Sequence, residues 1–198
     1  MADSHGDAAL IALAVDRMRQ EGCITLLHLG DICDSAHPQT ADACVSLLKR
    51  HAVLAVRGNN DHALVAAESD MGGPTLAWLQ RLPLVIETPM AVFVHSRAGV
   101  SRLGWAAMIG DMDDGEALRF MTAFPGRLLF RGHSHRASIR CLSPTGLIEA
   151  PLPKAGGFPA PLPGGAVITC GSLCDGAAWI WNPPQATLQR LSIGRPDR

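Results

Sequence analysis

Seven side chains with oxygen or imidazole donors stand in five short polar segments of this sequence, and together they could bind metal ions. The candidate ligands are Asp3, His5, Asp31, Asn59, His95, His133 and His135. None of the segments offers a thiolate in the matching position, which favours Mn, Fe, Zn or Co over a cysteine-bound structural zinc. Seven donors suit two divalent cations that share one carboxylate. Such ions lower the pKa of water from about 15.7 toward neutrality, so the set indicates hydrolytic chemistry.

Each of these segments alone also has an ordinary structural explanation. Gly-Asp after a strand is good turn chemistry, and asparagine tolerates a left-handed backbone. His95 could be a hydrogen-bonded core residue. His133 and His135 are more specific, because alternate residues of an extended chain point the same way and could hold neighbouring metals. The combination of all five segments favours the metal site.

The elements that must position these segments are βα units followed by hairpins. We expect helices at 7–20, 39–50, 75–81 and 116–124. We expect strands at 23–29, 52–56, 84–87, 91–95, 128–131, 138–142, 146–149, 167–170, 178–181 and 187–193. The segment 150–165 is rich in proline and glycine and predicts a loop. This order indicates an α/β fold in which chemistry gathers at the carboxyl ends of strands.

The bulk composition excludes several classes of protein. A chain of 198 residues, 47% of them hydrophobic, suits a single domain covering residues 1–198. A formal net charge of −1 does not suit bulk nucleic-acid binding or an anionic membrane surface. The sequence contains neither an apolar run of membrane-spanning length nor an opening signal peptide, so we expect a cytoplasmic protein. Its six cysteines are expected to be reduced thiols.

The order of the polar segments resembles one known family. The pattern D-x-H, G-D-x-x-D, G-N-x-D, H and G-H-x-H between Asp3 and His135 is similar to that of the calcineurin-like metallophosphoesterases, and most similar to their small bacterial phosphodiesterase branch. The resemblance implies a four-layer α/β/β/α sandwich of two mixed sheets flanked by helices. It also implies a dinuclear metal centre.

Carried over motif by motif, the resemblance divides the ligands between two ions. The first ion is assigned Asp3, His5 and His135, and the second is assigned Asn59, His95 and His133. Asp31 would bridge the two ions. Asp34 and Asp61 match acidic positions that orient their neighbours.

The sequence departs from the family pattern at its start. The family has an apolar strand before D-x-H, whereas only Met1 and Ala2 precede Asp3 here. Two residues cannot form a central strand, so the first strand is expected to be missing. We expect that the recorded start is too late or that the chain is a truncated form.

A second departure is Asn60, where many family members have a histidine suited to protonating the leaving group. Asparagine cannot donate a proton in that way, and His62 could substitute for it. Arg57 and Asn60 are the candidate substrate contacts, through the phosphate. Asp31, Asn59, Asp34, Asp61 and His62 are the candidate catalytic residues.

The expected function is metal-dependent cleavage of a phosphodiester or phosphomonoester by a hydroxide that bridges two divalent ions. Manganese is the preferred metal, with Fe, Zn, Co or Ni as alternatives, and the expected partner is a small phosphorylated substrate. Self-association of the chain is left open. One alternative is a mononuclear metallohydrolase centred on His133 and His135. The other is a catalytically weak interaction scaffold with the same fold. Substrate selectivity is expected from 61–73, 97–114 and 150–165.

Overall fold

The computed structural model describes residues 1–67, 71–152, 158–159 and 164–194. Its α-helices are α1 (Ala8–Gln20), α2 (Ala41–Arg50), α3 (Asn59–Ala66), α4 (Gly73–Arg81), α5 (Val100–Leu103) and α6 (Asp114–Ala123). Short 3-10 helices are η1 (Pro38–Thr40), η2 (Gly104–Met108) and η3 (Leu173–Asp175). The strands are β1 (Leu27–His28), β2 (Leu54–Ala55), β3 (Val85–Glu87), β4 (Ala91–Val94), β5 (Leu128–Arg131), β6 (Ser138–Ser143), β7 (Gly146–Ala150), β8 (Phe158–Pro159), β9 (Ala166–Thr169), β10 (Ala177–Asn182) and β11 (Thr187–Ser192).

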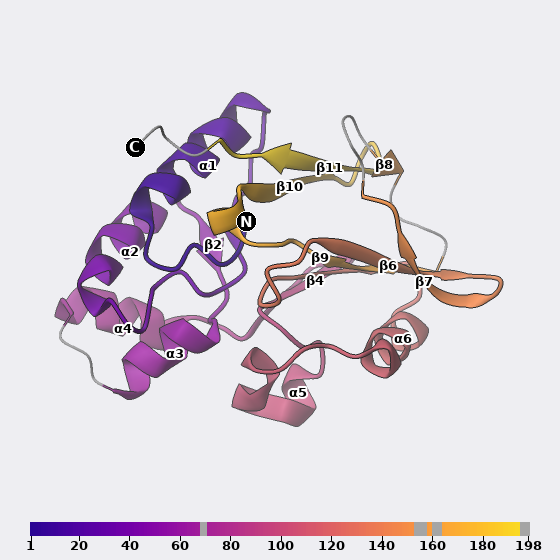
Figure 1. Cartoon of the computed structure of the whole chain (residues 1–198), viewed down its shortest axis with the longest axis horizontal. Helices are drawn as coiled ribbons and strands as arrows, with labels where there is room; N and C mark the ends of the chain where they lie inside the picture. Colours follow the sequence, from indigo (N-terminus) through magenta and orange to yellow (C-terminus); the bar gives the residue numbers. More distant parts are fainter. Residues whose placement is uncertain (68–70, 153–157, 160–163, 195–198) are drawn as a thin grey trace.

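The described strands form one large mixed sheet and a second, divided layer. The large sheet has the order β3-β4-β5-β9-β6-β7, in which β4, β5 and β9 are parallel neighbours. The second layer contains the parallel pair β1-β2 and the antiparallel group β10-β11-β8. Figure 1 shows β10 and β11 lying over one face of the large sheet, with α5 and α6 on its other face. The helices α1 to α4 gather at one end of the molecule, beside the sheets.

Three hydrophobic clusters separate these layers. One strand contributes side chains to two clusters, because its successive side chains point to opposite faces of the sheet. In β4, Phe93 packs into the cluster between the sheets, whereas Val92 and Val94 pack toward α6. In β10, Trp179 faces the cluster between the sheets and Ala178 faces the helices α1 to α4. Four layers separated by three cores make up the α/β fold that the sequence predicted.

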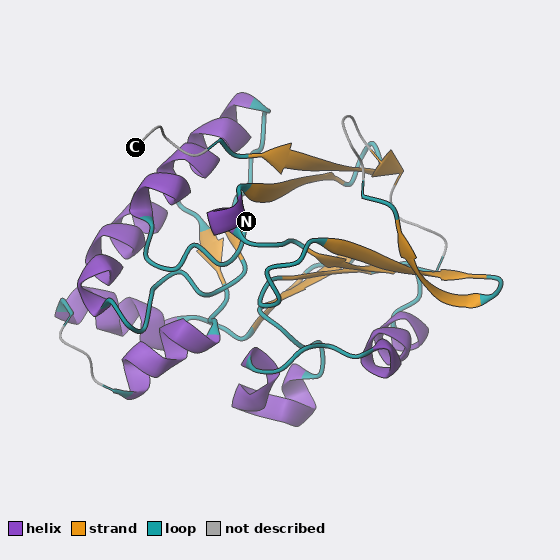
Figure 2. Ribbon diagram, viewed as in Figure 1, coloured by secondary structure: helices purple, strands orange, loops and turns teal. Residues whose placement is uncertain are grey.

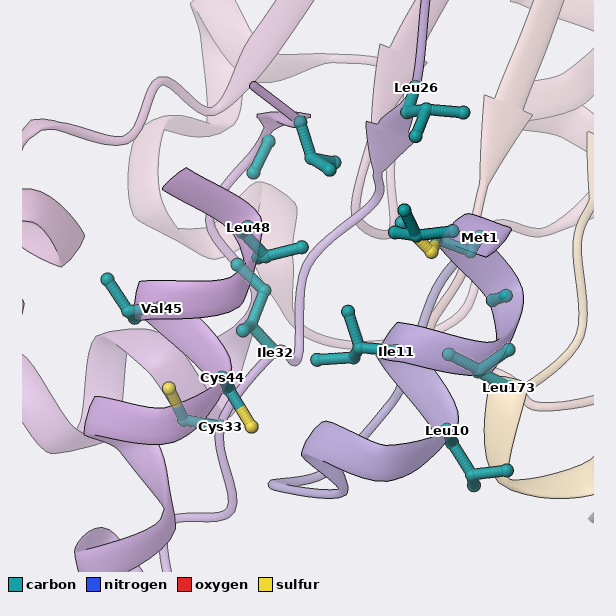
Figure 3. Close-up of a cluster of buried hydrophobic side chains, with 14 of the residues drawn as sticks. Met1, Leu10, Ile11, Leu26, Ile32, Cys33, Cys44, Val45, Leu48 and Leu173 are labelled. Carbon is teal, nitrogen blue, oxygen red and sulfur yellow. The ribbon is translucent and has the colours of Figure 1, made fainter. Parts of the chain in front are cut away.

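The helix α1 illustrates how local sequence signals form these elements. The Asp7 side chain accepts a hydrogen bond from the Leu10 N–H at 3.0 Å and so caps the helix. Its buried residues recur at helical spacing and pack into the helix-side core. Figure 3 shows part of that core, where Ile11 lies in one cluster with Met1, Leu26 and Leu173.

No strand precedes Asp3 among the described residues, but Met1 and Ala2 are not loose. Both are buried, at 4% and 0% exposure. The Met1 nitrogen donates to the Leu27 carbonyl at 3.1 Å, and the Leu29 N–H donates to the Met1 carbonyl at 2.9 Å. On the other side, the Leu173 N–H donates to the Ala2 carbonyl at 2.8 Å. These two residues therefore join the β1 pair to the β10 region.

Some elements differ from the sequence-based expectation. The segments predicted as strands at 23–29 and 52–56 contribute only two paired residues each, in β1 and β2. The segment after Gly58, which lies outside the expected helices, forms the helix α3, and the Asp61 carboxylate caps it from its own first turn. Within the expected loop 150–165, β7 extends to Ala150 and Phe158–Pro159 form β8, while residues 153–157 and 160–163 lie outside the described residues. None of the described helices combines the length and the apolar character needed to cross a bilayer.

Candidate metal centre

The polar segments singled out in the sequence meet at one place, where loops follow β1, β2, β4 and β5. Figure 2 shows loops gathered between the helical end of the molecule and the large sheet. Seven described non-glycine residues have a positive φ, and five of them are candidate ligands. These five are Asp3, His5, Asp31, His133 and His135, with φ between 44° and 72°. This conformation costs about 1–2 kcal/mol per residue, and strain of this kind clusters at functional sites.

One group of donors consists of Asn59, His95 and His133. The Asn59 Oδ1 lies 3.0 Å from both His95 Nε2 and His133 Nδ1, and the two nitrogens are 3.2 Å apart. His95 Nδ1 donates to the Leu29 carbonyl at 2.8 Å, which leaves a lone pair on Nε2. An amide oxygen and two imidazole nitrogens of three residues therefore converge on one point.

A second group consists of Asp3, His5 and His135. The Nε2 atoms of His5 and His135 are 3.0 Å apart, and His135 Nε2 lies 3.8 Å from Asp3 Oδ1. The ligand atoms of all three residues lie within 4.8 Å of one another. Asp3 is buried, and its carboxylate accepts the His133 N–H at 3.0 Å, which ties the first segment of the chain to the segment after β5.

Asp31 stands between the two groups. Its Oδ1 lies 3.5 Å from His95 Nε2, and its Oδ2 lies 4.0 Å from His5 Nε2. The backbone N–H of Asn60 donates to Oδ1 at 2.8 Å, and the Asn60 amide donates to Oδ2 at 2.7 Å. Two hydrogen bonds thus hold the carboxylate with one oxygen toward each group.

The electrostatics of this place are unfavourable without a cation. Burial, and after it the charge of the nearby Asp31 carboxylate, raise the pKa of Asp3 to about 8. Burial also lowers the pKa of His95 to about 4 and lowers the pKa of His133 and His135 from the usual value. The three imidazoles are therefore neutral near pH 7, which is the state that binds metals.

The donor set fits divalent cations on the geometry of this structure. Converging lone pairs of imidazole and amide groups repel one another, and two buried carboxylates lie among them. A positive charge in each group would relieve both the repulsion and the burial of negative charge. The mixture of carboxylate, amide and imidazole donors suits Mn, Fe, Co, Ni or Zn.

Asp61 holds the surrounding loops and touches none of the converging donors. It is fully buried, and its two oxygens accept the N–H groups of Cys33 at 3.0 Å and Gly58 at 2.9 Å. Burial, together with the Asp31 charge, raises the pKa of this carboxyl. Asp61 thereby fixes the loop that carries Asp31 against the start of α3, which carries Asn59.

Close backbone approach explains why glycines flank the candidate ligands. A Cβ atom at Gly58 would overlap the Asp31 backbone nitrogen and Oδ1. A Cβ atom at Gly132 would lie 2.5 Å from Asp3 Oδ2. Glycine at these places lets one loop reach the ligand of the next.

The remaining predicted residues lie beside the donors. Asp34 is partly exposed, and it accepts the Ala36 N–H and pairs with His37 at 2.8 Å. His62 stacks on Trp105 with ring centroids 4.8 Å apart, and its buried Nδ1 has no hydrogen-bond partner among the described residues.

Arg57 is buried rather than free in the site. Its guanidinium donates to the Gln80 carbonyl and lies 4.8 Å over the Trp105 ring. The Asn60 amide is occupied at both ends, because its Oδ1 also accepts the Ser35 hydroxyl at 2.6 Å. Contact of Arg57 or Asn60 with a substrate stays a prediction.

Two supporting residues were missed as site components. The Ser172 hydroxyl donates to the Asp3 carbonyl at 2.8 Å, and the Ser4 hydroxyl lies 3.0 Å from Nε2 of the buried His28. No local pattern links Ser172 to Asp3, because the two residues are 169 positions apart. No local pattern links Ser4 to His28, because their contact joins segments 24 residues apart.

Comparison with known proteins identifies the family of this chain. The family model described as the calcineurin-like phosphoesterase superfamily domain matches residues 1–150. The chain therefore belongs to the calcineurin-like phosphoesterases, a family of metal-dependent hydrolases. Among curated proteins, no sequence matches this chain.

Two solved structures share its fold. A metallophosphoesterase from Sphaerobacter thermophilus is 17% identical, covers 99% of this chain and 87% of its own, and superposes with a TM-score of 0.73. A putative diadenosine tetraphosphatase is 18% identical, covers 98% of this chain and 92% of its own, and has a TM-score of 0.58. At these identities the likeness extends to the fold alone.

Proposed function

We propose that this phosphoesterase binds two divalent cations, bridged by Asp31, and hydrolyses a phosphodiester or phosphomonoester of a small molecule. The observation that carries the proposal is the position of Asp31. Its two oxygens face different donor groups, at 3.5 Å from His95 Nε2 and 4.0 Å from His5 Nε2. A carboxylate held in this way is suited to serve two ions at once.

The residues of the chain itself would bind the cations and orient them. Asp3, His5 and His135 would bind one cation, and Asn59, His95 and His133 the other. When bound, the cations supply charge that acidifies water and offsets the charge developing on the phosphate. Manganese is the cation that we propose.

The surrounding residues keep the donors in place and serve the substrate. Asn60 orients Asp31, and Asp61 fixes the loops on either side. We assign proton donation to the leaving group to His62, which follows Asn59 by one helical turn of α3. We propose that Arg57 contacts the phosphate of the substrate and that Asp34 orients neighbouring residues of the site.

The state of the cysteines indicates the cellular compartment that we propose. The buried Cys33, Cys44, Cys141 and Cys170 are free thiols, which suits a reducing compartment, so we place the enzyme in the cytoplasm. Its substrate is a small phosphorylated molecule.

The test is hydrolysis of bis(p-nitrophenyl) phosphate and of a panel of phosphorylated metabolites, with and without added Mn²⁺. We expect turnover that needs Mn²⁺ and is abolished by a chelator, together with two metal ions per chain. One metal ion per chain at full activity would support the mononuclear alternative. A protein that binds two ions and hydrolyses nothing in the panel would support the scaffold alternative.

A further inference from the structure

Trp105 is a large apolar side chain that stays exposed beside the candidate metal centre. It lies in η2, within the segment 97–114 from which substrate selectivity was expected, and 52% of it is exposed. A single exposed apolar residue is ordinary on a protein surface. The contacts of the ring, and the way in which its segment is held, therefore decide whether it can serve a substrate.

Part of the Trp105 ring packs against the start of α3. The His62 ring stacks on it with centroids 4.8 Å apart and planes inclined by 20°, and the Arg57 guanidinium carbon lies 4.8 Å from its centroid. His62 follows the candidate ligand Asn59 by three residues, so the two lie on the same face of α3 with Cβ atoms about 5–6 Å apart. The Trp105 ring, which lies one ring contact beyond His62, is therefore roughly 10 Å from Asn59.

The segment after β4 holds η2 from another side. Arg97 lies two positions beyond the candidate ligand His95, and its N–H donates to the Ala107 carbonyl at 2.9 Å. The Ser96 hydroxyl donates to a carbonyl just beyond η2. Ala107 is buried, so η2 is anchored although Trp105 is exposed. The ring is thus fixed to both segments that supply Asn59 and His95, two ligands of one donor group.

The part of the Trp105 ring that these contacts leave free can accept a flat aromatic ligand. An indole presents a broad apolar face on which planar rings stack. Every nucleobase has a π-face and can stack on an aromatic side chain, whatever its hydrogen-bonding pattern. The Arg57 guanidinium against the same ring places a positive charge here, which suits a ligand that also carries a phosphate.

The distance between the ring and the donor atoms distinguishes among aromatic ligands. In a phenyl phosphate the ring is joined directly to the phosphate, so a phosphate at the donor groups would leave that ring short of Trp105. A nucleotide has a ribose between its phosphate and its base. The ribose lengthens the ligand, so that the base can lie against the indole while the phosphate lies at the donor groups.

We propose that Trp105 is a base-stacking residue and that the substrates of this phosphoesterase are nucleotides, with the phosphate at the donor groups and the base on the exposed part of the indole. This assignment rests on the proposed function, because it places the phosphate at the metal centre. Trp105 would determine specificity, whereas Arg57 and His62 would position its ring.

The test is calorimetric titration of the Mn²⁺-loaded protein with three ligands: analogues of adenosine 5′-monophosphate, ribose 5-phosphate and phenyl phosphate. Each is used as its phosphonate, in which a CH₂ group replaces the ester oxygen and prevents hydrolysis. The nucleotide analogue should bind about 5- to 150-fold more tightly than the other two, which is the range expected for stacking of one base.

Variants of η2 and its flank assign this preference to the ring. Trp105→Ala should abolish most of the advantage of the nucleotide analogue, and Trp105→Phe should keep most of it. Ile109→Ala is the matched control, because it removes a side chain that is 56% exposed just after η2 and has no ring. It should keep the full advantage. The ratio of affinities is compared within each variant, so a general disturbance of the site cancels.

Equal affinities of the three ligands for the unaltered protein would overturn the assignment, as would a nucleotide preference that survives Trp105→Ala. A loss shared equally by all three ligands would give Trp105 a structural role instead. Absence of binding by the nucleotide analogue at millimolar concentration would also overturn it. Turnover is measured separately: base preference without hydrolysis would contradict only the proposed function, and hydrolysis without base preference would contradict only the stacking site.

Discussion

Asp31 lies between the two donor groups of the candidate metal centre. It is buried, faces both donor groups and receives two hydrogen bonds from Asn60. His5 belongs to one group only and is partly exposed. Removing Asp31 should therefore disturb both ions, whereas removing His5 should disturb one.

We expect Asp31→Ala to lower the rate of hydrolysis by about 10³-fold and His5→Ala by about 10- to 100-fold. Metal content per chain, measured by elemental analysis, should fall for both ions in Asp31→Ala and mainly for one in His5→Ala. Asp16→Ala, which removes an exposed carboxylate on α1, is the matched control and should change neither quantity. Near-normal turnover with full metal content in Asp31→Ala would contradict the bridging role.

His62 can be tested without disturbing its packing. His62→Phe keeps an aromatic ring against Trp105 but removes the ring nitrogens, so the side chain can no longer donate a proton. If His62 protonates the leaving group, alkyl phosphodiesters should lose about 10²-fold in rate, whereas p-nitrophenyl esters, whose leaving group needs no proton, should change little. A uniform loss across leaving groups of different pKa would assign His62 a structural role instead.

At the scale of elements, the site depends on how closely the loop after β1 approaches the start of α3. Gly58 is the N-cap of α3, and a side chain there would overlap Asp31. The Asp61 carboxylate also joins these two segments, because it accepts the N–H groups of Cys33 and Gly58. The helix thus places Asn59 and Asn60 against Asp31 through its first turn.

Gly58→Ala should therefore lower the free energy of unfolding by about 1–3 kcal/mol and weaken metal binding. Gly73→Ala is the matched control, because a Cβ atom there meets no atom of the described residues within 4 Å and the residue lies in the first turn of α4. It should be neutral or slightly stabilising. Thermal unfolding and Mn²⁺ titration measure both effects, and equal behaviour of the two variants would show that the close approach is not needed.

At the scale of the whole molecule, the metal centre joins parts of the chain that are distant in sequence. Asp3 receives the His133 N–H and its carbonyl accepts the Ser172 hydroxyl, so the start, middle and end of the chain meet around one carboxylate. Buried like charges and converging lone pairs oppose this assembly when no cation is bound. Cation binding should therefore stabilise the entire fold.

We expect Mn²⁺ at about 100 times its Kd to stabilise the protein by about 2.7 kcal/mol for one site. For a chain of this size that corresponds to a rise in Tm of about 5–11 °C, measured by calorimetry. Mg²⁺, which prefers oxygen ligands, should give a smaller rise at equal concentration. Asp31→Ala should lose most of the Mn²⁺ effect, and an unchanged rise in that variant would place the stabilising cation elsewhere.

Much of this protein could be predicted from residue types and spacing alone. Helical periodicity located α1, and short continuous apolar runs located β4, β5 and β9, because both signals are local consequences of backbone geometry and burial. The polar segments at the start of the chain and at the ends of the predicted strands indicated the seven candidate ligands, since carboxyl ends of strands collect chemistry. The family followed from the order of the same segments and is borne out by the match over residues 1–150.

The tertiary structure decided what depends on contacts between distant segments. The sequence could not show that Asp61 caps α3 and also accepts a hydrogen bond from Cys33. Nor could it show that the Asn60 amide donates to Asp31. The position of the buried Arg57 against the Trp105 ring was equally invisible in it. It also could not show how Met1 and Ala2 pair with Leu27 and Leu173. Local patterns report the periodicity of one segment, whereas these features come from packing, burial and hydrogen bonding between segments that only the folded chain brings together.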